Sequence, residues 1–290
     1  MHLFHACSAF WAFMAWLVLA APALSQEVEL TLQSAERNVD FVSPIYLQFD
    51  IKNVGDEPYT FVRPTLDYTN FRMEASARDG DVANILFIDR GYGYGLVGGP
   101  DATVTLQPGW TARYYLLRSS AHYQQWEPDF WRRIQEIGYF DLSAVYRPKR
   151  AKDANPQATY TLAAKCELRT ASISRNDQKR LDELFSEKGR QAVSLYMLGQ
   201  LGPSTSLDRL HSLRGTFESK SLNDTIEFLY LQYRAYKSPP EEKAAAQADF
   251  DRWLNQLPEI QRMAIRHVGN PESGISKTFL LDEAGKPVKE

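Results

Sequence analysis

The stretch IYLQFDIKNVGDEP, residues 45–58, contains the pattern that decides the fold of the first half of the chain. Apolar side chains alternate with polar ones over residues 45–52, and a segment rich in Gly, Asp and Pro follows. A strand that buries one face needs this alternation, and the residues after it are typical of a turn. The stretch therefore predicts a half-buried antiparallel strand that ends in a tight turn.

The same two-residue period recurs through much of the segment 26–171. Turn residues separate the repeats, with Gln107-Pro108-Gly109 before one strand and Gly138 before another. Several short alternating strands with turns between them are typical of two packed antiparallel sheets. The further alternating stretches are residues 28–32, 70–75, 110–116, 140–146 and 160–168.

Three of these stretches resemble strands of bacterial extracytoplasmic immunoglobulin-like domains. They are LQFDIKNVGDEP (residues 47–58), LQPG (residues 106–109) and GYFDLSAVY (residues 138–146). The resemblance implies an immunoglobulin-like antiparallel β-sandwich over residues 26–171. The chain departs from the family at Phe140, where a tyrosine usually bonds a neighbouring corner of the backbone. The fold implies no activity, because such domains host many unrelated binding roles.

The period changes after residue 171, and residues 172–269 are expected to form helices. Ser174 with Asp177, and Ser221 with Asp224, have the pattern of helix N-caps, and Pro239-Pro240 suits a first turn. Short connections predict an antiparallel helical-hairpin array, so the fold class is α+β with two domains, and residues 270–290 are expected to form a polar, loosely ordered tail. The expected helices are residues 174–189, 191–201, 204–217, 222–236, 240–257 and 258–268.

The first 25 residues have the pattern of a secretory signal peptide. An apolar run covers residues 6–21, and Ala23 and Ser25 provide small residues before a mature start at Gln26. The run is short for a membrane span, so no integral span is expected after cleavage. An uncleaved anchor stays open as an alternative, because the segment before the run has His2 and His5 but no Lys or Arg. The expected location is periplasmic or secreted.

Charge and cysteine content exclude several classes of protein. The net charge is −3, which argues against nucleic-acid binding. Only Cys166 remains in the mature chain, so an intramolecular disulfide is excluded. Its place in the alternation puts the thiol on the inward face of a strand, where a cysteine is inert.

No motif in the sequence assigns a reaction. His122, His211 and His267 lie in separate segments and form no zinc-binding spacing, and no GxSxG elbow is present. We therefore expect no catalytic residues, no metal and no cofactor, and a non-enzymatic protein is favoured.

Two aromatic groups are candidate binding residues. Tyr92 and Tyr94 lie in the glycine-rich stretch 91–99, which can equally be a hairpin tip. Trp126 and Trp131 can stack on sugars or anchor a partner, or can form a hydrophobic staple around a short helix that begins at Pro128.

A third candidate is the basic segment that contains Arg147, Lys149 and Arg150. Such a loop fits an acidic partner or phospholipid headgroups, and it also fits a solvated hairpin.

These observations predict a non-enzymatic extracytoplasmic binding or scaffold protein that acts on another envelope macromolecule, either a protein or a glycan. Two alternatives stay open. One is a carbohydrate-binding module that uses the four aromatic residues, and the other is a hydrolase whose site is assembled from distant loops.

Overall fold

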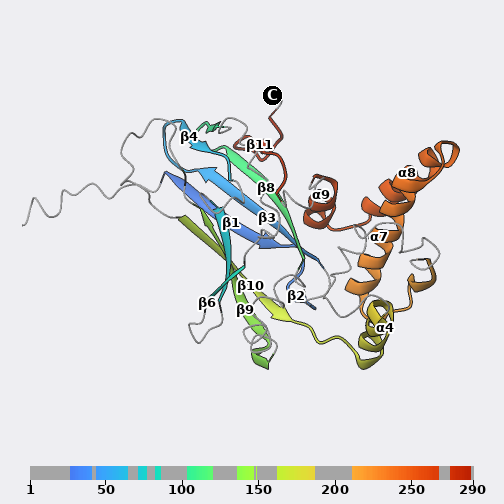
Figure 1. Cartoon of the computed structure of the whole chain (residues 1–290). Coiled ribbons are helices and arrows are strands. Elements are labelled where there is room, and N and C mark those ends of the chain that lie inside the picture. The colour runs from blue at the N-terminus through green and yellow to red at the C-terminus, as the bar shows by residue number, and fades with distance from the viewer. Residues whose placement is uncertain are drawn as a thin grey trace, which may run out of the picture.

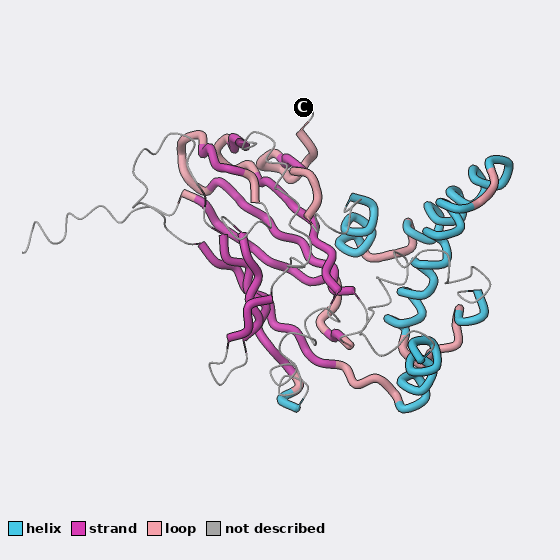
Figure 2. The backbone as a smooth tube through the Cα atoms, viewed as in Figure 1, coloured by secondary structure: helices cyan, strands magenta, loops and turns pink. Residues whose placement is uncertain are grey.

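The computed structural model shows antiparallel sheets in the N-terminal half of the chain and helices in the C-terminal part (Figures 1 and 2). It describes residues 27–40, 44–64, 71–76, 82–85, 103–119, 136–146, 148, 162–186, 211–267 and 275–288. Residues 1–25, the expected signal peptide, lie outside these ranges. The part of the chain that the structure describes contains no helix long and apolar enough to cross a membrane.

Two main sheets form the N-terminal half. Sheet A has the order β1-β3-β8-β11, and each of its neighbouring pairs is antiparallel. Sheet B has the order β2-β10-β9-β5-β6 and is antiparallel except between β2 and β10. A small third sheet pairs β4 with β7. The strands are β1 (Val28–Ser34), β2 (Asn38–Val39), β3 (Pro44–Asn53), β4 (Tyr59–Val62), β5 (Phe71–Ser76), β6 (Val82–Ile85), β7 (Thr103–Leu106), β8 (Thr111–Ser119), β9 (Tyr139–Tyr146), β10 (Leu162–Thr170) and β11 (Phe279–Leu281).

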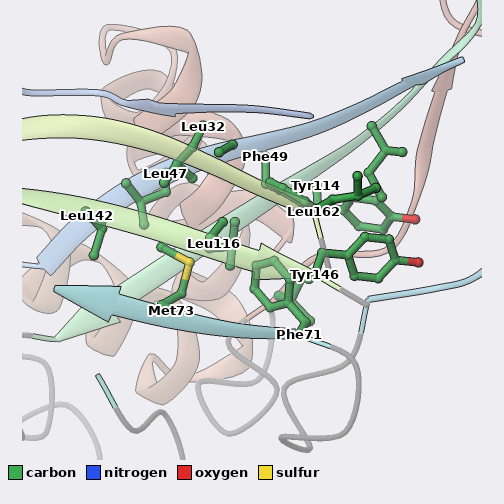
Figure 3. Close-up of a cluster of buried hydrophobic side chains, with 14 of the residues drawn as sticks. Leu32, Leu47, Phe49, Phe71, Met73, Tyr114, Leu116, Leu142, Tyr146 and Leu162 are labelled. Atoms are coloured by element: carbon green, nitrogen blue, oxygen red, sulfur yellow. The ribbon is translucent and has the colours of Figure 1, made fainter. Parts of the chain in front are cut away.

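Sheets A and B face each other across one apolar core (Figure 3). Phe49 of β3 lies 5.0 Å from Phe71 of β5 and 6.2 Å from Tyr146 of β9, measured between ring centroids. The alternation predicted this inward face correctly. The phenol of Tyr146 donates a hydrogen bond to the backbone carbonyl of Val62 at 2.5 Å, which ties the core to the end of β4. A buried phenol of this kind needs such a partner.

Part of the outer face of sheet A, over β3 and β8, is also buried, which the alternation did not predict. Tyr46, Gln48 and Asp50 of β3 are each at most 9% exposed, although they occupy the expected solvent side. They are covered because helices pack on this face. Tyr46 and Tyr115 form a second apolar core there with residues of the C-terminal helices. Burying a side chain as large as Tyr115 contributes roughly 2–3 kcal/mol, so this face stabilises the helical layer.

The helices begin where capping residues and proline predict, with one shift of two residues. α4 (Arg175–Ser186) follows Ser174, whose Oγ accepts the backbone N–H of Asp177 at 3.1 Å. α7 (Lys220–Lys237) is capped by Ser219 and not by Ser221, so the expected cap was wrong. Pro240 opens the next helix as expected. The next two helices are α8 (Pro240–Leu254) and α9 (Glu259–His267). The expected helix 191–201 lies outside the described residues, and of the expected helix 204–217 only residues 211–217 are described, where the helix ends at residue 213 before a turn.

The C-terminal segment differs from the expected loose tail. Residues 275–288 are described, and β11 adds to the edge of sheet A beside β8. The reason is that this mainly polar segment contains Ile275, Phe279 and Leu280, which pack on the two cores. Sheet A is therefore completed only after the chain has passed through the helices (Figure 1).

Candidate functional site

The candidate binding residues from the sequence all fall outside the described residues, so their roles stay predictions. The structure therefore gives no arrangement of these residues relative to one another. They are Tyr92, Tyr94, Trp126, Trp131, Arg147, Lys149 and Arg150.

A polar network lies on the outer face of sheet A, where the helices pack against β3 and β8. This contact region between sheet A and the helices is called the seam. The Asp50 carboxylate accepts two hydrogen bonds from the Arg113 guanidinium, each 2.9 Å long, and a third from the Gln48 amide at 2.9 Å. The hydrogen bond to Asp50 raises the pKa of Arg113. Because paired charges in fork geometry satisfy each other, this network ties β3 to β8 on the outer face of sheet A.

Tyr115 extends the seam toward the C-terminal segment. Burial raises the pKa of its phenol, and the neighbouring Arg113 opposes that shift. Its backbone N–H donates to Ser276 Oγ at 2.9 Å, and its ring lies 5.5 Å from the ring of Phe279. Tyr115 therefore joins β8, the helical layer and the C-terminal segment.

A small hollow lies where β1, β3 and the start of α7 meet. Ser34, Glu36, Asn38, Asp40, Tyr46 and Ser221 contribute to its lining. Its cavity volume is about 10 Å³, which is room for about one water molecule. The hollow is too small to admit a substrate group. Its lining residues instead form a contact between the strands and the start of α7, which is called the first joint.

Glu36 is the titratable group of this joint. Burial raises the pKa of its carboxyl, the positive charge of Lys220 opposes the shift, and the negative charges of Asp224 and Asp40 add to it. Lys220 also forms an ion pair with Asp224 one turn along α7. The joint thus connects the sheets to the first turn of α7 electrostatically.

A second joint connects α4 to α7 through one carboxylate. Asp177 is fully buried, and its two oxygens accept the backbone N–H groups of Glu218 and Ser219, each at 2.9 Å. These donors lie at the N-terminal end of α7, where backbone N–H groups lack helical partners. Asp177 therefore satisfies the start of α7 from the first turn of α4.

Helices α7 and α8 form a hairpin that projects from the sheets (Figure 1). Phe228 of α7 and Trp253 of α8 stack with their ring centroids 6.3 Å apart and their planes 19° apart, and Phe250 stacks on Trp253 at 6.1 Å. Arg234 pairs with Asp249 at 2.9 Å across the two helices. These contacts hold α8 against α7.

The outward side of α8 is open to solvent. Its first half is exposed except for Ala246, and its exposed side chains are small, polar or charged. Exposed positions include Lys243, Ala244, Ala245, Gln247 and Ala248. α8 therefore offers an open helical surface to a partner.

Cys166, His211 and His267 are each packed against other side chains. Burial raises the pKa of the Cys166 thiol to about 12, and Asp141 adds to the shift. His211 lies against Tyr230 and His267 against Phe279, at centroid distances of 5.4 and 4.8 Å. Within the described ranges, no group of three or more His, Cys, Asp or Glu residues is placed to hold a metal ion.

The sequence reasoning missed the seam and the two joints. One signal was present in Tyr114-Tyr115-Leu116-Leu117, where apolar side chains occupy both faces of β8. A strand buried on both faces has this continuous apolar pattern. No comparable local signal marks Asp177, because its partners lie 41 and 42 residues away in sequence.

Comparisons with known proteins add little to this geometry. No protein-family model matches the chain, and no curated protein matches it. One similar solved structure is the X-ray structure of Northeast Structural Genomics Consortium target SoR45. It is 13% identical with a TM-score of 0.24, and the match covers 51% of this chain and 89% of that one.

Proposed function

We propose that the protein is an exported, non-enzymatic binding or scaffold protein that contacts another macromolecule of the cell envelope. Its N-terminal part is an immunoglobulin-like β-sandwich, and its C-terminal part is an antiparallel helical-hairpin array. The helices act with the sandwich as one unit, because the seam, the joints and β11 connect them at several points.

Two facing sheets with a shared aromatic core support the immunoglobulin-like part of the proposal. The resembling stretch 47–58 contributes β3 and its turn, and there Asn53 donates hydrogen bonds to the carbonyls of Glu57 at 2.8 Å and Leu106 at 3.0 Å. This turn therefore holds two separate loops at one end of the sheets, a place where such folds often bind partners.

The observation that carries the binding role is the projecting α7–α8 hairpin with its open outer side. A binding surface benefits from a rigid support, because less conformational entropy is lost when the complex forms. The aromatic stack and the Arg234–Asp249 ion pair supply this support. We infer that α8 is the contact surface.

Export is part of the same proposal. Cleavage after Ser25 would leave Gln26 as the mature N-terminus. N-terminal sequencing of the protein recovered from a periplasmic fraction or the medium tests this directly. An intact Met1 in a membrane fraction would show the uncleaved anchor instead.

The binding role is tested by crosslinking in intact cells, affinity purification and mass spectrometry. Ala245→Glu places a charge on the open side of α8 without opposing helix formation, and Ala163→Glu is a matched change at an exposed position of β10. We expect one reproducible envelope partner with the wild type and with Ala163→Glu, and its loss with Ala245→Glu. Recovery of abundant bystanders alone, or specific turnover of ester, glycoside or peptide substrates, would overturn the proposal.

A further inference from the structure

The C-terminal segment, residues 275–288, binds the edge of β8 as an added strand. Leu281, Leu280 and Phe279 pair antiparallel with Thr111, Ala112 and Arg113 of β8, and Ile275 bridges to Leu116. The backbone N–H of Ser276 donates to the carbonyl of Tyr115 at 2.8 Å. Main-chain pairing along a sheet edge is the way in which folded proteins bind extended peptides.

Side chains fix the register of this strand at a few points. Arg63 donates to the carbonyl of Ser276 at 2.7 Å, and Ser276 Oγ accepts the backbone N–H of Tyr115 at 2.9 Å. The hydroxyl of Thr278 donates to the phenol oxygen of Tyr114 at 3.3 Å. The edge of β8 therefore contacts a hydroxyl side chain at two positions of the segment, 276 and 278, that have one residue between them.

The apolar side chains of the segment enter both cores. Ile275 and Leu280 contact the core between the sheets, and Phe279 contacts the core between sheet A and the helices. Phe279 packs edge-on against Tyr115 with 76° between the rings, and the ring of His267 of α9 lies 4.8 Å from it. Phe279 is thus the aromatic anchor of the strand.

β11 is the shortest strand of sheet A. β11 has three residues, and all three are only half-buried, whereas β3 is buried along nearly its whole length. Short edge strands with solvent-exposed hydrogen bonds open at lower free energy than central strands. The segment also folds back on itself, with Val288 donating to Leu280 and Asp282 to Lys286, each at 2.9 Å, so it covers the sheet edge while it is bound.

We propose that the β8 edge is a strand-acceptor site, which the chain's own residues 275–288 occupy until an extended strand of a partner protein replaces them. The partner strand carries the chemistry of the resident one. It has an aliphatic residue, then a hydroxyl residue, a second hydroxyl residue two positions later, and then an aromatic and an aliphatic residue. This site is separate from the α8 surface, so it stands or falls independently of that surface.

The resident strand sets the affinity of the site. Only molecules with the edge open can bind a second strand, so the apparent affinity equals the intrinsic affinity reduced by the open fraction. Removing the Phe279 ring from the resident strand raises the open fraction. We expect a peptide in trans to bind the Phe279→Ala chain about tenfold or more tightly than the wild-type chain.

The test uses the full chain and a fluorescently labelled peptide of sequence ISKTFLLDEAGKPV, residues 275–288. Binding is followed by fluorescence anisotropy with the wild type, Phe279→Ala and the matched control Phe250→Ala. Phe250 is a half-buried aromatic of α8 whose ring stacks on Trp253. A peptide in which both the Ile275 and the Phe279 positions are changed to Asp serves as the negative ligand.

Tighter saturable binding to Phe279→Ala, with little change for Phe250→Ala and no binding of the Asp peptide, supports the acceptor site. Ser276→Ala, a smaller change in the same strand, replaces Phe279→Ala if that chain does not fold. Absence of binding to every folded variant would overturn the proposal. A dimer of the full chain that exchanges this segment between copies would also overturn it, because a second copy would then be the occupant.

Discussion

Replacing Asp177 with Asn should weaken the connection between α4 and α7. The buried carboxylate accepts two backbone N–H groups at 2.9 Å, one from Glu218 and one from Ser219. An Asn side chain has one oxygen and one NH₂ group, so at least one N–H would lose its acceptor and face a donor. The negative charge near the starts of both helices would also be lost.

The magnitude follows from these two losses. A buried donor left without an acceptor costs about 1–3 kcal/mol, and a charge at a helix N-terminus contributes about 0.3–1 kcal/mol. We therefore expect the free energy of unfolding to fall by roughly 1–4 kcal/mol in Asp177→Asn. Urea unfolding at neutral pH measures this as a lower midpoint with an unchanged slope.

The neighbouring residue provides the control. Asn176 donates to Glu218 Oε1 at 2.7 Å on the exposed surface of the same joint. Asn176→Ala should change the free energy of unfolding by no more than about 0.5 kcal/mol, because its hydrogen bond competes with water. If Asp177→Asn were as mild as Asn176→Ala, the carboxylate would not hold the start of α7 and the reasoning would be refuted.

Three further changes probe the turns and titratable groups. Gly109→Ala should lower the melting temperature more than Gly215→Ala does. Both glycines have a positive φ, but only at Gly109 would an added Cβ lie 3.1 Å from Glu283. Equal shifts in melting temperature would contradict a contribution from that contact. Burial and nearby cations lower the pKa of His267, so the unfolded state binds a proton at this residue at a higher pH than the folded state does. The free energy of unfolding should therefore fall as the pH drops below about 6.5. Urea unfolding should show a shallower decline in His267→Gln. The Cys166 thiol, whose pKa burial raises to about 12, should resist iodoacetamide at pH 8 in the native protein and react in urea; rapid native labelling would show an accessible thiolate.

The sequence predicted the inward faces of the strands well, because a strand with one buried face has a local, repeating pattern. Leu47, Phe49 and Ile51 are buried as the alternation requires. The antiparallel sheets and the C-terminal helices are confirmed at this level. Helix starts were predicted where proline fixes them, as at Pro240, and missed by two residues where several serines compete, as at Ser219.

The seam could not be predicted because it depends on long-range packing. The alternation assigns Gln48 and Asp50 to solvent, and only the helices that arrive later in the chain bury them. The strand at residues 279–281 is too short to show a period, and its partner strand β8 is distant in sequence. Residues with distant partners leave no local signal, so the structure was needed to find them.

Site-specific photocrosslinking from α8 in intact cells tests the binding role most directly. A photoreactive phenylalanine analogue at Ala245, on the open side of α8, is compared with the same analogue at Ala163 on the exposed face of sheet B. We expect one discrete crosslinked product with an envelope macromolecule from position 245 and none from position 163. Identical weak smears from both positions, or no product from either, would contradict a protein that works by presenting α8 to a partner.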